Sequence, residues 1–354
     1  MKTQQVHTSP LAGLREIPIS DARQTRKDYA SDQEVRWCPG CGDYVILNAV
    51  QSFLPELGLR RENIAFVSGI GCSSRFPYYL NTYGMHSIHG RAPAIATGLA
   101  TARADLSVWV VTGDGDALSI GGNHLMHALR RNVNLTILLF NNRIYGLTKG
   151  QSSPTSEVGK VTKSTPMGLV DNPVNPVSLA LGAEATFVAR TIDSDRKHLT
   201  GVLRAAAAHR GAALVEIYQN CPIFNDGAFD ELLGSDDGVI RLEAGQPVRF
   251  GPDERYLVAR DPASGGMDVV DSSVHPDREP IVHNPGLADP SQAFSLSRLT
   301  DAGTMRRSPI GIFRQVERPS YDDEARQQVA LAKGSHRAAD LRALIRGSDT
   351  WTVG

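Results

Sequence analysis

The sequence predicts an α/β protein built on a doubly wound, mostly parallel β-sheet. Two continuous apolar runs, SVWVVT at 107–112 and NLTILLF at 134–140, are rich in β-favouring residues. Such runs are typical of strands buried on both faces of a parallel sheet. A segment with helical periodicity, 117–131, lies between them. Because alternating strands and helices imply parallel crossovers, these three segments indicate the fold class.

The alternation continues on both sides of this unit, and the chain is expected to divide into three parts. An N-terminal arm, 1–36, precedes a sheet domain at 37–229, and a C-terminal appendage, 230–354, follows. The appendage is richer in glycine, proline and charge and has no strong strand signal, so we expect part of it to be flexible. The further elements expected are strands at 64–68, 185–190 and 213–219, and helices at 43–54, 92–104, 195–210, 321–333 and 336–346.

Charge and hydropathy argue against several classes of protein. The formal net charge of -1 gives no electrostatic reason to expect a nucleic acid or an anionic membrane as partner. The longest apolar runs, such as 135–140, are too short to cross a bilayer, and the polar segment 1–36 has no apolar core like that of a signal peptide. We therefore expect a cytoplasmic protein. Its four cysteines are too few for a disulfide scaffold and favour metal or redox chemistry.

Polar motifs directly follow the two strongest strands. The sequence GDGD, 113–116, follows the first strand, Asn141-Asn142 follows the second, and 25 residues separate Gly115 from Asn141. Ligands collect at the carboxyl ends of parallel strands, so Asp114 and Asn142 are expected at one edge of the sheet. Carboxylate and amide oxygens suit Mg²⁺, and glycines let the backbone approach a phosphate. The alternative is a glycine turn beside a polar strand end, without any ligand.

The four cysteines form a second candidate site. Cys38 and Cys41 make a CxxC turn, Cys72 lies on the glycine-rich turn after the strand at 64–68, and Cys221 follows the strand at 213–219. Four thiolates are what a [4Fe–4S] cluster needs. A tetrathiolate zinc site, a redox centre on Cys38 and Cys41 alone, and plain burial of Cys72 and Cys221 are the alternatives. Spacing alone does not separate the cluster from zinc, but a neighbouring electron-donating cofactor would favour the cluster.

The spacing of GDGD and Asn141-Asn142 resembles the signature of thiamine-diphosphate enzymes. Six segments together resemble, in order and spacing, the β subunit of 2-oxoacid:ferredoxin oxidoreductases, over about residues 30–235. The resemblance implies a thiamine-diphosphate-binding fold. The segments are WCPGCG at 37–42, GIGCSSR at 69–75, HGRAPAIATGLA at 89–100, GDGD at 113–116, NNRIYGLTKGQ at 141–151 and NCPIFND at 220–226.

The resemblance implies a role for each matching residue. The four cysteines take the positions of cluster ligands, and the carbonyl of Ile144 joins the side chains of Asp114 and Asn142 around Mg²⁺. Leu147 would pack under the thiazolium, or be a core residue. The imidazole of His89 and the guanidinium of Arg91 suit contact with a diphosphate or a developing carboxylate, a surface pair being the alternative. The positions expected at thiamine diphosphate are Ile70, Gly71, Cys72, Ser73, His89, Gly90, Arg91, Gly113, Gly115, Asp116, Gly146 and Leu147.

The family reaction implied is oxidative decarboxylation of a 2-oxoacid to its coenzyme A ester, with electrons passing through the cluster to ferredoxin. Lys149 lies in the GLTKG loop and could pair with the distal carboxylate of 2-oxoglutarate, although a solvated loop lysine is the plainer interpretation. The sequence favours 2-oxoglutarate over pyruvate on this ground. No glutamate is evident that could contact the aminopyrimidine, so the resemblance implies an α subunit that supplies it, in an αβ pair present twice. A non-redox thiamine-dependent decarboxylase and a zinc-binding interaction subunit are the alternatives.

Overall fold

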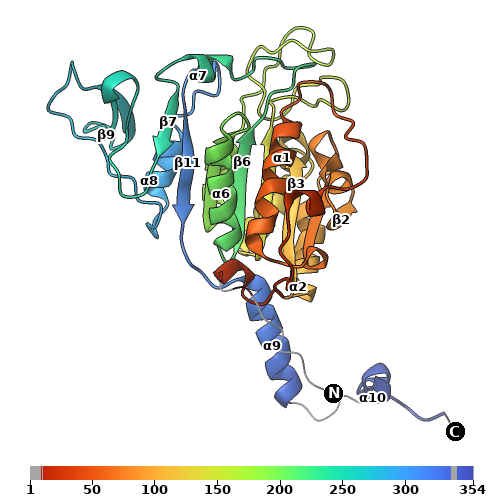
Figure 1. Cartoon of the computed structure of the whole chain (residues 1–354). Coiled ribbons are helices and arrows are strands. Elements are labelled where there is room, and N and C mark those ends of the chain that lie inside the picture. Colours follow the sequence, from red (N-terminus) through yellow and green to blue (C-terminus); the bar gives the residue numbers. More distant parts are fainter. Residues whose placement is uncertain (1–8, 10, 336–340, 354) are drawn as a thin grey trace.

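An eight-stranded, mostly parallel sheet forms the centre of the molecule (Figure 1). The computed structural model describes residue 9, residues 11–335 and residues 341–353. The strand order is β2-β1-β3-β4-β6-β5-β11-β7; the pairing of β11 with β5 is antiparallel, so β11 and its parallel neighbour β7 run against the other strands. This confirms the predicted fold class. The strands are β1 Ile64–Ser68, β2 Tyr83–His86, β3 Ser107–Gly113, β4 Leu135–Asn141, β5 Phe187–Ile192, β6 Ala212–Tyr218, β7 Val239–Leu242 and β11 Ser308–Gln315.

Helices cover both faces of this sheet. The helices α1 (Asp43–Phe53) and α6 (Arg196–Ala208) pack on one face, where they lie in front of the strands in Figure 1. The other face is covered by α2 (Ala92–Ala102), α4 (Gly122–Arg130), α5 (Pro176–Gly182) and α8 (Ser291–Ser297). The remaining helices are α3 Asp114–Leu118, α7 Asp230–Gly234, α9 Tyr321–Ser335 and α10 Leu341–Arg346.

The bounds of the predicted strands lie within two residues of the observed ones. The prediction succeeds because side chains buried along the whole strand give an unbroken apolar run in the sequence. All five residues of β1, all seven of β4 and all seven of β6 are buried. The register of the strands brings the GDGD and Asn141-Asn142 motifs together. Gly113 pairs with Phe140 across β3 and β4, and Asn141 pairs with Tyr218 across β4 and β6. The loops that leave β1, β3, β4 and β6 therefore meet at one edge of the sheet.

The region expected as an appendage is not separate from the sheet. Strands β7 and β11 extend the main sheet beyond β5, and residues 249–271 add a small antiparallel sheet of β8 (Arg249–Phe250), β9 (Tyr256–Arg260) and β10 (Met267–Asp271). The expectation that strand signals stop after Phe229 was wrong here. β11 contains Pro309, Gly311 and Arg314, so it lacks the unbroken apolar run that marked the other strands. A boundary at residue 229 divides one continuous sheet.

The N-terminal arm is docked along its described part. Leu14, Ile17 and Tyr29 are buried in the same core as α1 and α6. Short bridges tie Ile19 to Leu59 and Ala30 to Leu80. At its other end the described chain continues into α9, which packs near α2 before leaving the body of the molecule (Figure 1). The helix expected at 336–346 begins outside the described residues, which contain α10 from Leu341 onward. No described helix is long and apolar enough to cross a membrane.

Candidate active site

A pocket of about 430 Å³ opens at the carboxyl ends of β1, β3 and β4. Its volume is in the range of pockets that hold cofactors and substrates. The glycine-rich turns after β1 and β3 form its backbone walls, and the loop after β4 closes it. Its lining residues are Ile70, Gly71, Cys72, Ser73, His89, Gly113, Asp114, Gly115, Asp116, Phe140, Asn142, Ile144, Tyr145, Gly146, Leu147, Thr148 and Gln151.

The carboxylate of Asp114 lies at the base of this pocket, at the first residue of α3. It is 2% exposed, and its Oδ2 accepts hydrogen bonds of 2.5 Å from the hydroxyls of Ser153 and Thr155. Burial raises the pKa of Asp114 to about 6, although these hydrogen bonds act in the opposite direction. Since a buried carboxylate is stabilised by a cation, the donor set fits a divalent metal at this point.

The two asparagines that end β4 have different surroundings. Asn141 is buried, and its amide donates to Glu216 on β6, a residue that forms a fully buried ion pair with Arg190. Asn142 instead lines the pocket, and its Oδ1 accepts from the backbone N–H of Ile144 at 3.2 Å. Asn141 therefore anchors the strand end, while Asn142 and Ile144 are placed to hold a ligand.

Asp116 organises the opposite wall of the pocket. Its Oδ1 accepts from the backbone N–H groups of Ile70 and Gly90 and lies 2.6 Å from Nδ1 of His89, while its Oδ2 accepts from Thr112. An Nδ1–H that donates to this carboxylate leaves Nε2 as the free nitrogen of the imidazole. Asp116 therefore orients His89 and joins the loops after β1, β2 and β3.

Glycine is required beside this carboxylate. A Cβ at Gly69 would lie 1.8 Å from Oδ2 of Asp116, and one at Gly115 would lie 2.3 Å from the ring of Tyr145. The Tyr145 hydroxyl donates to the carbonyl of Gly115 at 2.8 Å. The glycines of both turns thus allow side chains from neighbouring loops to pack directly on the backbone of the pocket.

Arg91 lies outside the residues that line this pocket. Its guanidinium contacts the carbonyls of His89 and Ile120 at 3.4 Å, and the residue precedes α2 as its N-cap. Gly90 is buried and does not line the pocket, but its N–H donates to Asp116, which does. The structure thus brings His89 to the pocket and leaves Arg91 beside it.

The four cysteines surround a second pocket, of about 190 Å³, adjoining the first. Cys41 and Cys221 are buried, Cys72 is half-buried and Cys38 is exposed. The residues Cys72, Asn142, Gly146 and Leu147 line both pockets, and Lys149 lines the second only. A Cβ on Gly146 would be in van der Waals contact with the sulfurs of Cys72 and Cys221. The predicted cysteine constellation is therefore brought together, beside the predicted cofactor pocket.

The thiols lie in surroundings that disfavour bare thiolates. Burial raises the pKa of Cys72 to about 12 and raises the pKa of Cys41 further, and the carboxylate of Asp43 and the neighbouring cysteines act in the same direction. Metal coordination is a means of deprotonating such thiols. Within the described part of the chain, no group of three or more His, Cys, Asp and Glu side chains is placed to hold a single metal ion.

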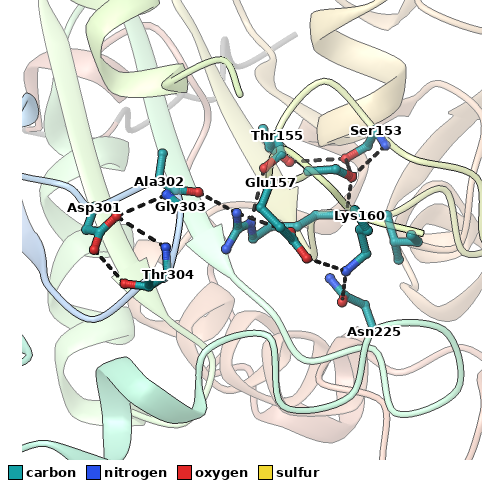
Figure 2. Close-up of polar contacts among 12 residues, drawn as sticks. Ser153, Thr155, Glu157, Lys160, Asn225, Asp301, Ala302, Gly303 and Thr304 are labelled. Carbon is teal, nitrogen blue, oxygen red and sulfur yellow. Dashed lines mark hydrogen bonds and ion pairs between the residues drawn. The ribbon is translucent and has the colours of Figure 1, made fainter. Parts of the chain in front are cut away.

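A buried arginine, Arg143, holds the loop after β4 in place. Arg143 has a φ of 60° and is 4% exposed; its guanidinium donates to the carbonyls of Thr155 and Ala302 and pairs with Glu157 at 3.2 Å. Figure 2 shows the loop of Asp301 to Thr304 facing Thr155 and Glu157. The C-terminal part of the chain thus supports the loop that carries Asn142.

A second set of contacts links this loop to the cysteine pocket. Lys160 donates to Glu157 and to Asn225, and the amide of Asn225 donates to the backbone carbonyl of Asn142 at 2.8 Å. Asn225 is also bridged to Cys221. The residues that support the two sites were not predicted. Four of them lie within the recognised motifs but were given no role: Arg143, Tyr145, Gln151 and Asn225. The others lie outside the motifs: Ser153, Thr155, Glu157, Lys160 and Gln219.

Comparison with known proteins gives a consistent result. Residues 69–217 match the family model described as the thiamine pyrophosphate enzyme, C-terminal TPP binding domain. The 2-oxoglutarate oxidoreductase subunit KorB of Mycobacterium tuberculosis is 66% identical over 95% of this chain and 91% of its own length. A 2-oxoacid:ferredoxin oxidoreductase subunit beta of Sulfolobus sp is 39% identical over 81% of this chain and 84% of its own.

A solved structure agrees with these relatives. It is described as 2-oxoglutarate:ferredoxin oxidoreductase from Magnetococcus marinus with 2-oxoglutarate, coenzyme A and succinyl-CoA bound. One of its chains superposes with a TM-score of 0.74 at 34% identity, covering 92% of this chain and 97% of that one. With pocket, cysteines and sheet arranged as described, the chain belongs to the β subunits of the 2-oxoacid:ferredoxin oxidoreductase family.

Proposed function

We propose that this chain is the β subunit of a 2-oxoglutarate:ferredoxin oxidoreductase that forms succinyl-CoA and CO₂. In this reaction 2-oxoglutarate loses its C1 carboxyl as CO₂, the acyl group forms a thioester with coenzyme A, and two electrons and one proton are released. Two ferredoxins accept the electrons one at a time. One observation supports this proposal above the others: the pocket of Asp114 and Asn142 shares a wall with the pocket of the four cysteines.

The first pocket fits thiamine diphosphate with Mg²⁺. Thiamine diphosphate supplies, when bound, the carbanion chemistry by which a 2-oxoacid loses CO₂. Asp114 and Asn142 would hold the cation with their side-chain oxygens, and Ile144 with its carbonyl, while the turns at Gly71 and Gly115 approach the diphosphate. His89, oriented by Asp116, lines the same pocket and would be available to a bound ligand.

The second pocket fits a [4Fe–4S] cluster, held by Cys38, Cys41, Cys72 and Cys221. Such a cluster accepts electrons singly, which is what oxidation with ferredoxin requires. Leu147 lies between the two pockets and is 45% exposed, as expected of a side chain that a bound cofactor would cover. A non-redox decarboxylase would have no use for these thiols, and a zinc-binding interaction subunit would have none for the first pocket.

An α subunit is expected to complete the enzyme. Among the described residues that line the first pocket, none is a glutamate, and a glutamate is the group expected at the aminopyrimidine. We propose an αβ pair, present twice, in which the α subunit supplies this group. Ile88, which precedes the lining residue His89, and Ile120, whose carbonyl accepts from Arg91, are 71% and 52% exposed and would be covered by it.

An anaerobic assay of the co-purified αβ complex tests the proposal. The complex is given thiamine diphosphate, Mg²⁺, coenzyme A and a viologen dye, with either 2-oxoglutarate or pyruvate. Coenzyme A-dependent dye reduction that prefers 2-oxoglutarate is expected. A preference for pyruvate would overturn the substrate assignment alone, and a colourless complex that reduces no dye would overturn the redox function. The isolated β chain is expected to be inactive.

A further inference from the structure

One buried glutamine touches a residue from each of the two pockets. Gln219 follows β6 directly, two residues before Cys221, and is 1% exposed. Its Oε1 accepts from the amide of Asn142 at 3.0 Å, and its Nε2 donates to the sulfur of Cys41 at 3.3 Å. Its backbone N–H donates to the carbonyl of Asn141 at 3.0 Å, so the main chain is held as well.

Backbone groups determine which way both amides face. Nε2 of Gln219 donates to the carbonyl of Asn220, which can only accept, so the oxygen of the Gln219 amide must lie on the other side. That oxygen can only accept, so it faces Nδ2 of Asn142 rather than Oδ1. At the far end, the N–H of Ile144 donates to Oδ1 of Asn142. The hydrogen-bonded series from Gln219 through Asn142 to Ile144 therefore has a single orientation.

Space for the glutamine is provided by the CxxC turn. A Cβ on Gly42 would lie 2.9 Å from Cγ of Gln219 and 2.0 Å from Oδ2 of Asp193. The N–H of Gly42 donates to the carbonyl of Asn220, the same carbonyl that orients Gln219. The position of the turn that carries Cys38 and Cys41 is thus coupled to the position of the glutamine side chain.

We infer that Gln219 is a positioning residue that links the metal ligand Asn142 to the cluster ligand Cys41. It presents Oδ1 of Asn142 towards the cation and donates one N–H to the sulfur of Cys41. Hydrogen bonds to cluster sulfurs help to set the reduction potential, and partners of metal ligands contribute to metal affinity. One side chain therefore acts on both the affinity for the cofactor and the potential of its electron acceptor. This inference rests on the proposed function.

Gln219→Met tests it in the αβ complex, because methionine has a similar length and neither donates nor accepts strongly. The apparent Kd for Mg²⁺ with thiamine diphosphate is expected to rise about 10-fold, the lower end of the effect of removing a partner of a metal ligand. The midpoint potential of the cluster, followed by anaerobic redox titration, is expected to fall. Gln51→Met is the matched control: Gln51 is also buried, but its amide donates to the backbone carbonyl of Tyr79, which belongs to neither ligand set. It should change neither quantity.

A brown Gln219→Met complex with both quantities unchanged would overturn the inference, and a change in only one would overturn the link between the two sites. If the variant does not fold, the hydrogen bond to Cys41 can be tested in the wild-type complex. Glutamine labelled with ¹⁵N in its side chain should give a nitrogen coupling in pulsed EPR of the reduced cluster, and its absence would disprove the hydrogen bond to Cys41. A wild-type complex that stays colourless after reconstitution would instead overturn the proposed function.

Discussion

Side chains at the site act in one of two ways: they line the pocket as candidate ligands, or they hold another side chain in position. Asp114 and Asn142 line the pocket as the candidate ligands of a cation, whereas Asp116, which also lines it, holds the imidazole of His89 in place. The sequence motif GDGD does not distinguish the two aspartates, because they are two residues apart in one short helix. Hydrogen bonds separate them: Asp114 accepts from two hydroxyls, and Asp116 accepts from two backbone N–H groups.

Asp116→Asn should lower kcat/KM by about 100-fold, the low end of what a positioned acid–base group contributes. An asparagine can offer its oxygen to His89 and its NH₂ group to the Thr112 hydroxyl, but a neutral amide oxygen accepts the N–H of His89 more weakly than a carboxylate does, so the imidazole is held less firmly. If Asp116 acts through His89, the double variant Asp116→Asn/His89→Asn should be no slower than His89→Asn alone. Additive losses in this double-mutant cycle would refute the assignment. Asp105→Asn, which affects an exposed pair with Arg103, serves as the control.

Lys149 is the residue on which the choice of substrate is expected to depend. It lines the cysteine pocket, in a left-handed conformation with φ of 75°, next to the wall that both pockets share. Lys149→Ala should raise KM for 2-oxoglutarate about 10-fold through loss of a charge-assisted hydrogen bond, and leave KM for 2-oxobutyrate nearly unchanged. Lys163→Ala, an exposed lysine that lines neither pocket, is the control. Equal effects on both substrates would reject the pairing with a distal carboxylate.

At the scale of elements, the strands that could be predicted from the sequence are those that are buried on both faces, because such burial requires a continuous run of apolar residues. The strands β3, β4 and β6 are buried on both faces, so a continuous apolar run marks each of them. The edge strand β2 has four exposed residues, and β11 is interrupted by proline and glycine, so neither carries that signal. The candidate ligands Asp114 and Asn142 could be predicted for the same reason, because each directly follows one of these strands.

The supporting residues could not be predicted in the same way. Arg143 contacts Ala302, 159 positions further along the chain, and Asn142 contacts Gln219 across 77 positions. Neither arginine nor glutamine has a local pattern that reveals a partner so distant in sequence. These contacts depend on the strand order, which places β4 next to β6 and brings the C-terminal segment back to the sheet.

Arg143→Met should therefore loosen the loop between β4 and Glu157. The guanidinium is 5% exposed, so the loss of its pair and carbonyl contacts is expected to cost about 3 kcal/mol of the free energy of unfolding. The same change should weaken binding of Mg²⁺ with thiamine diphosphate, since the loop carries Asn142. Urea denaturation and a cofactor titration measure the two effects. Arg318→Met, which removes a half-exposed pair with Glu184, should cost less than about 1 kcal/mol; equal losses would contradict a special role for Arg143.

At the scale of the whole molecule, the terminal parts of the chain close the domain. The described arm packs against α6, where the close approach of Gly13 to the carbonyl of His209 leaves no room for a Cβ. Residues 308–315 lie between β5 and β7 in the sheet. Asn132, after α4, donates to the carbonyls of Arg318 and Pro319. The described arm and the segment that leads into α9 thus meet the core at the end of the sheet opposite the pockets, and stability can be probed there without touching the site.

His209 is such a probe, because it is buried at this end of the molecule and, among the residues that the structure describes, no charged group acts on it. Its Nε2 lies 2.7 Å from the hydroxyl of Thr186, and its ring lies near Phe187. Burial lowers the pKa of His209 to about 4 from the ordinary value of 6.5. The unfolded chain therefore binds this proton more readily than the folded one, and stability is lost as the pH falls from 6.5 towards 4. Between pH 7 and pH 5 the loss should be about 2 kcal/mol.

Urea denaturation of the wild type and of His209→Gln at several pH values measures this loss. The difference in the free energy of unfolding between the two proteins should shift by this amount in favour of the variant as the pH falls. A difference that does not vary with pH would show that His209 titrates normally in the folded protein.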